Sequence, residues 1–133
     1  MKTILNTTGL SLALVAIALA GCGAKKSGPA DQVRAAAHTY FLAMANHDYQ
    51  GMCAQMSPAT QAHNIKLASA AGADTCAAAV KVGVGSASGD VAAQLRTDKI
   101  IVVALGKTVA GVRREHGTEL LRFRRIGTKW LLG

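Results

Sequence analysis

The sequence is poor in aromatic and in acidic residues. Phe, Tyr and Trp together make up 4% of the 133 residues although half of the residues are hydrophobic. Any core must therefore be built from small side chains around a few large anchors. Asp and Glu number 7 against 15 Lys and Arg, which gives a net charge of +8 concentrated late in the chain. A basic region suggests a nucleic acid, an anionic membrane surface or an acidic partner, and a simply solvated sheet face is the plainer interpretation.

The N-terminal apolar run, residues 10–20, is shorter than the ~20 residues needed to cross a bilayer. Together with Lys2 it has the pattern of a secretory signal peptide. The run ends in Leu19-Ala20-Gly21-Cys22, which resembles the lipobox of bacterial lipoproteins. The resemblance implies cleavage before Cys22 and acylation of that cysteine with chains such as palmitate. The alternative is an ordinary secretory signal with a chance cysteine.

This pattern divides the chain into three parts. Residues 1–21 are expected to be a lipoprotein signal peptide, 22–30 the lipidated cysteine and a linker, and 31–133 a single domain. Two acyl chains hold a protein stably on a bilayer. We therefore expect an exported protein anchored by lipid to the cell membrane or outer membrane, where a nucleic acid is not an expected partner.

If lipid occupies Cys22, only Cys53 and Cys76 remain, and in an oxidising compartment they have only each other to pair with. A redox-active pair would favour a C-x-x-C spacing, which is absent. His63 lies between the two cysteines, but no fourth ligand for a metal is suggested. We expect a structural disulfide between Cys53 and Cys76, no metal site and no cofactor.

Capping residues followed by apolar residues at helical spacing predict four helices in the first half of the domain. Residues 83–89 have the composition of a loop, and the pattern then changes to strands. The expected helix starts are Asp31, Asp48, Ser57-Pro58, and Asp74 or Thr75. The expected strands are 99–105, a β-branched run typical of a buried strand, followed by 108–114, 119–126 and 129–132. This order predicts an α+β domain with N-terminal helices packed on a curved antiparallel sheet.

Alternation in the third expected strand separates two kinds of side chain. If Leu121 and Phe123 enter the core, Arg122 and Arg124 lie on the opposite face. Arg113 on the neighbouring strand is expected to join them. Clustered arginines can bind phosphates or carboxylates in bidentate fashion, so these three are candidates for contact with anionic lipid or an acidic envelope partner.

The order of elements resembles the nuclear-transport-factor-2-like fold, and most closely its small exported lipoproteins. Three features carry the resemblance: the helix break at Asn46-His47-Asp48-Tyr49, Cys53 near Ser57-Pro58 with Cys76 opening a later helix, and a final hairpin ending at Trp130. The resemblance implies a cone with a small apolar ligand at its mouth. It also implies that the outer sheet face pairs subunits, as a homodimer.

Enzymes of this fold place tyrosine, aspartate or histidine inside the cone, which makes Tyr40 on the first helix the candidate for such a pocket; the plainer interpretation, which we favour, is a core anchor with a hydrogen-bonded hydroxyl. A tyrosine that stabilises an oxyanion needs a partner base, and no acidic residue falls within the apolar strands. We therefore rank a non-enzymatic, membrane-anchored accessory or interaction module first. A binder of a small apolar ligand in the cone is second, and an isomerase-like or dehydratase-like enzyme third.

We expect Cys22→Ala to release the protein from membranes without unfolding it, because Cys22 lies outside every periodic segment. Fractionation and thermal unfolding of the variant check the two halves of this expectation. Mass spectrometry of the wild-type protein should find lipid on the Cys22 peptide. An unmodified protein that starts at another residue would contradict the anchor.

Overall fold

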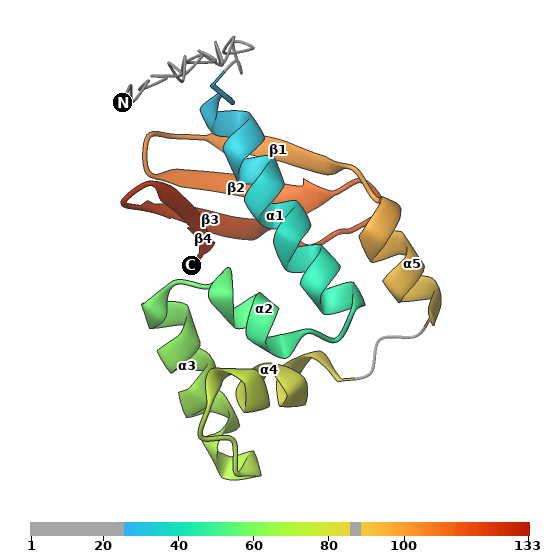
Figure 1. Cartoon of the computed structure of the whole chain (residues 1–133), viewed down its shortest axis with the longest axis vertical. Helices are drawn as coiled ribbons and strands as arrows, with labels where there is room; N and C mark the ends of the chain where they lie inside the picture. Colours follow the sequence, from blue (N-terminus) through green and yellow to red (C-terminus); the bar gives the residue numbers. More distant parts are fainter. Residues whose placement is uncertain (1–25, 86–88) are drawn as a thin grey trace, which may run out of the picture.

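The computed structural model describes residues 26–85 and 89–133, shown in Figure 1. The expected signal peptide and Cys22 lie outside these described residues. Helices come first and strands last, which confirms the α+β class. The helices are α1 (Pro29–Ala45), α2 (Tyr49–Ala54), α3 (Pro58–Ala68) followed by the single 3-10 turn Ser69–Ala71, α4 (Cys76–Val84) and α5 (Gly89–Thr97). The strands are β1 (Ile100–Leu105), β2 (Val109–Arg114), β3 (Leu121–Ile126) and β4 (Lys129–Leu132).

The four strands form an antiparallel meander in the order β1-β2-β3-β4. Helix α1 lies across one face of this sheet, and α5 packs beside α1 (Figure 1). Helices α2, α3 and α4 pack on one another and form a separate group beyond β4 (Figure 1). The sequence predicted several helices on the sheet, whereas α1 is the main helix covering it, since α3 and α4 bury their small residues mainly against each other.

The helix starts follow from local capping. The Asp48 carboxylate accepts from the Gly51 amide at 2.8 Å, and Ser57 and Thr75 hydroxyls cap α3 and α4 in the same way. Helix α1 begins earlier than Asp31, because Pro29 occupies its first turn after Gly28. Asp31 instead sits in the first turn, where its charge favours the helix N-terminus.

Two expectations about the middle of the chain were wrong. Helix α5 was not predicted, since it has only two buried residues, Ala92 and Leu95, and so shows little periodicity. Strand β1 was predicted to be buried, but it is an edge strand, and Val103 and Leu105 are 47% and 46% exposed. The continuous apolar run therefore predicted a strand correctly, but it did not mean that both faces of the strand are buried.

The core lies between α1 and the sheet and continues to α2. Its largest fully buried side chains are Phe123, Met52, Val33 and Val112. Phe123 pairs with Ala110 on one side and Leu132 on the other. Arg122 and Arg124, its chain neighbours, are exposed. The alternation predicted for this strand is confirmed.

Cys53 and Cys76 form a disulfide, with their α-carbons 6.1 Å apart. The bond joins α2 to α4 and so connects the group of small helices internally. Its partners are 23 residues apart in the chain, so the chain-entropy model gives a contribution of about 3 kcal/mol to stability. The disulfide expected from the cysteine count is confirmed.

The burial contrast within β3 gives a stability prediction. Phe123→Ala should lower the free energy of unfolding by about 3–5 kcal/mol, because the ring is fully buried. The double substitution Arg122→Ser with Arg124→Ser should change it by no more than about 0.5 kcal/mol, because both side chains are exposed. Chemical denaturation measures both values. Equal losses in the two variants would contradict this strand register.

Candidate functional site

Tyr40 is held on α1 at the point where that helix meets α3 and α4. Its side chain is buried, and its ring stands edge-on to Phe41 with the centroids 5.5 Å apart. Neighbouring positions on a helix point about 100° apart, so the two rings point in different directions although both belong to the main core. Phe41 belongs to the main core, beneath the guanidinium of Arg114 at 5.5 Å. Tyr40 lines a cavity.

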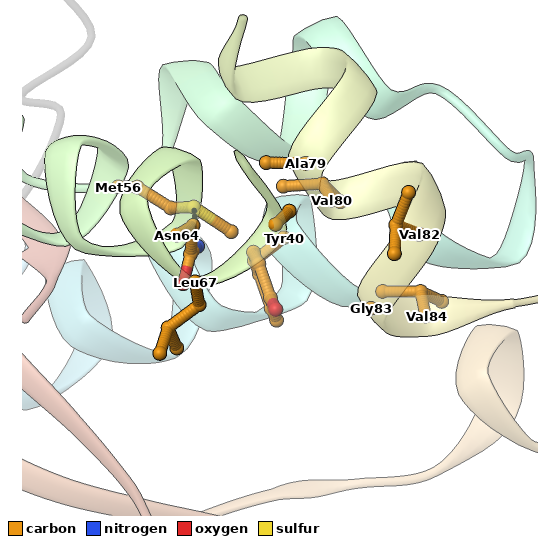
Figure 2. A pocket seen from close by; sticks show the side chains of 10 residues that line it. Tyr40, Met56, Asn64, Leu67, Ala79, Val80, Val82, Gly83 and Val84 are labelled. Atoms are coloured by element: carbon orange, nitrogen blue, oxygen red, sulfur yellow. Dashed lines mark hydrogen bonds between the residues drawn. The ribbon is translucent and has the colours of Figure 1, made fainter. Parts of the chain in front are cut away.

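This cavity has a volume of about 330 Å³. Figure 2 shows Tyr40 between Asn64 and Leu67 of α3 on one side and Val82 and Val84 of α4 on the other. Its walls are almost entirely aliphatic, with Tyr40 and Asn64 as the polar members of the lining. The remaining wall residues are Met56, Ala68, Ala79, Val80 and Gly83.

The polar groups that line the cavity have hydrogen-bonding capacity that no described residue satisfies. The Tyr40 hydroxyl makes no hydrogen bond with any residue in the two described ranges, and in Figure 2 it points away from Ala79 and Val80. The Asn64 amide nitrogen donates to the Met56 sulfur at 3.4 Å, which leaves the Asn64 carbonyl oxygen as a free acceptor. Burial raises the pKa of Tyr40 to about 12, and the Glu119 carboxylate adds to the shift. At neutral pH the phenol is therefore protonated and can donate a hydrogen bond.

The cavity is not the one that the sequence suggested. A pocket at the mouth of a cone would be walled partly by the sheet, but α1, α3, α4 and Met56 supply the whole lining here. The space between α1 and the sheet is filled instead by core side chains such as Phe123 and Val112. Among the residues that the structure describes, no acidic residue or histidine lines the cavity.

A second polar cluster was missed by the sequence reasoning. Asp98, between α5 and β1, has a side chain only 3% exposed. Its carboxylate accepts from Arg114 at 2.9 Å through one oxygen and from His116 Nδ1 at 2.8 Å through the other. The partners lie at the end of β2 and just beyond it, so the sheet register brings them to Asp98.

The cluster is best explained as a structural tie. The hydrogen bond from His116 lowers the pKa of Asp98, with the nearby positive charges assisting, although burial opposes the shift. The same hydrogen bond raises the pKa of His116. A buried carboxylate needs such partners, because the loss of one would leave its charge uncompensated. The cluster thus fastens the start of β1 to the end of β2.

The three candidate arginines share one face of the sheet. Arg122 pairs with Gly111 and Arg124 with Val109, and Arg113 lies two positions from Gly111 on β2. Arg122 and Arg124 are exposed, whereas Arg113 is half-buried. The face opposite α1 therefore carries the arginine cluster expected from the sequence.

No protein-family model, curated protein or solved structure matches the chain. Within residues 26–85 and 89–133, no group of three or more His, Cys, Asp or Glu side chains is arranged to hold a metal ion. In the same ranges no single helix has the length and apolar character to cross a membrane. The pair Pro58–Ala71 and Cys76–Val84, bent by 69°, meets those criteria only when taken together.

The Asp98 cluster predicts how stability depends on pH. His116 has a raised pKa in the folded state, so its contribution is complete below its ordinary value of 6.5 and is lost as pH rises through the folded value. Asp98 has a lowered pKa, so its contribution is present above its ordinary value of 3.8 and is lost as pH falls through the folded value. Thermal unfolding should show a loss above pH 6.5 that His116→Gln removes.

The matched control is His63→Gln, which changes an exposed histidine on α3. This variant should keep the wild-type pH dependence. If His116→Gln and the wild type lose stability in parallel between pH 6 and 8, the contact with Asp98 does not contribute in solution.

Proposed function

We propose that this chain is an exported, lipid-anchored module that binds a small, mostly apolar ligand in the cavity beside Tyr40. The observation that carries the proposal is the Tyr40 hydroxyl, which is protonated, has no hydrogen-bond partner among residues 26–85 and 89–133, and reaches the open side of a cavity with aliphatic walls. Ligand sites commonly combine apolar walls with a few polar groups that fix orientation.

The cavity limits the chemistry of the ligand. A volume of about 330 Å³ lies at the small end of the range for ligand sites. Its rim residues Leu67 and Val82 are 68% and 53% exposed, so a bound apolar molecule would also cover them. A hydroxyl or carbonyl on that molecule would pair with Tyr40, and a donor would suit the carbonyl oxygen of Asn64. An aliphatic alcohol, ketone or similar molecule fits this description.

Binding is favoured over catalysis by the same lining. General acid–base chemistry needs a second titratable group within hydrogen-bond reach of the reacting atoms. The cavity lining offers none besides Tyr40, whose pKa of about 12 keeps it in one protonation state at neutral pH. The role consistent with this arrangement is recognition.

The lipid anchor and the nuclear-transport-factor-2-like fold are two further parts of the proposal, and each is supported by a different observation. The lipobox-like Leu19-Ala20-Gly21-Cys22 supports attachment to an envelope membrane. The element order, with a long first helix across a final antiparallel meander, supports a nuclear-transport-factor-2-like domain. A helix-lined cavity would then be a variation on the ligand position of that family.

Titration with 1-octanol and with n-octane tests the binding site. Both should raise the unfolding temperature, since both bury apolar surface in the cavity. Tyr40→Phe should weaken octanol binding by about threefold to tenfold, the value of one net hydrogen bond of about 0.5–1.5 kcal/mol, and leave octane binding unchanged. Calorimetry measures the affinities.

A filled cavity provides the matched control. Gly83 lines the cavity and a β-carbon added there would meet nothing within 4 Å, so Gly83→Leu adds an aliphatic side chain at the cavity wall without a clash. This variant should lose both ligands. Ala62→Leu, which adds the same side chain on an exposed position of α3, should keep them. Octanol binding that survives Gly83→Leu would place the site elsewhere and overturn the proposal.

A further inference from the structure

The charges of the sheet are all of one sign. Residues 99–114 and 120–133 contain no aspartate or glutamate, while Lys and Arg occur throughout both segments. The acidic residues near the sheet are Asp98, just before β1, and Glu115 and Glu119, in the β2–β3 connection at the same end. The β1–β2 and β3–β4 turns are at the opposite end of the strands, since the meander alternates its turns. The strands and turns at that end therefore contribute cations only, and the acidic residue that lines the adjoining groove, Asp31 of α1, is paired with Arg34.

The chain enters the domain beside the same end. Ser27 and Gln32, just before and within the start of α1, line one groove together with Thr128, Lys129 and Trp130. Figure 1 shows α1 starting on the side of the molecule away from α3 and α4. Cys22 lies four residues before Lys26, and four residues span at most ~14 Å. A lipid on Cys22 would hold the β3–β4 turn close to the bilayer.

Exposed apolar side chains accompany the cations there. Leu105, Val109 and Ile126 flank the two turns and are each more than a third exposed. Lys107, Arg125 and Lys129 are exposed among them. We call these six residues the hairpin end. Cations mixed with aliphatic side chains are typical of surfaces that rest on the headgroup region of a bilayer.

We propose that the hairpin end docks on an anionic phospholipid surface, an inference that rests on the proposed lipid anchor. Docking sets the orientation of the domain, because the chain enters at this end and α4 lies away from it (Figure 1), while the start of α3 adjoins Arg125 and Ile126. The anchor supplies attachment, and the hairpin end supplies orientation.

Paramagnetic relaxation in lipid nanodiscs tests the orientation, because it compares the methyl signals of aliphatic residues at the hairpin end with those of aliphatic residues on α3 and α4. The mature lipidated protein is placed in discs of phosphatidylcholine with or without phosphatidylglycerol, each doped with a gadolinium-chelating lipid. With phosphatidylglycerol, the methyl signals of Leu105, Val109 and Ile126 should broaden strongly. Those of Leu67 and Val82, which lie on α3 and α4 and are more exposed, should broaden little. Without anionic lipid the difference should shrink.

Charge variants identify the cause. Lys107→Gln with Lys129→Gln should lower the docked-to-undocked ratio by up to about thirtyfold, since each lysine contributes up to about 1 kcal/mol near such a surface. Lys66→Gln with Lys81→Gln, exposed on α3 and α4, should leave the ratio unchanged.

The outcomes separate the two proposals. Protein that never joins the discs refutes the anchor and the docking together. Protein that joins the discs but broadens equally at both ends keeps the anchor and overturns the docking. Broadening that is independent of phosphatidylglycerol, or a stable dimer that hides the hairpin methyls, also overturns it in favour of another occupant.

Discussion

The structure depends on the close packing of α1 against the sheet. This contact buries Val33 and Ala37 completely, together with Phe41, and the Phe123 ring fills the opposite side. The alanines of α1 allow the helix to approach closely, so a core with few aromatic residues still reaches a dense packing. One side of α1 is thereby fixed, and the other side, with Tyr40, is presented to α3 and α4.

The cavity exists because that second side is covered by small helices. The Cys53–Cys76 disulfide joins α2 to α4, and α4 in turn packs on α3. Alanine and glycine on α4, such as Ala79 and Gly83, leave space where larger side chains would close it. The small side chains that make up much of the core therefore also leave space beside the Tyr40 hydroxyl.

Local chemistry made much of the fold predictable. Asp48, Ser57 and Thr75 cap helices as their sequence context indicated, and the alternation of Phe123 with its flanking arginines gave the correct faces of β3. Helix α5 was missed because two buried residues make too short a pattern. Strand β1 was assigned the wrong environment, since an apolar run does not show whether both faces are covered.

The sites were less predictable, because they depend on contacts between distant segments. Tyr40 was identified as a pocket residue, but the walls of that pocket come from α3 and α4, whose packing no local pattern specifies. The Asp98 cluster depends on the β1–β2 register, which brings Arg114 and His116 to a carboxylate 16 and 18 residues earlier. The signal available in the sequence was Asp98 directly before β1, together with the basic residues Arg114 at the end of β2 and His116 just after it.

The most direct test of the central claim is a crystal structure of the protein purified from its native membrane without added ligand. The account predicts a bound, mostly apolar molecule between α3 and α4, with a polar atom about 2.5–3.0 Å from the Tyr40 hydroxyl. A cavity closed by its own side chains, or a Tyr40 hydroxyl bonded only to protein groups, would contradict it.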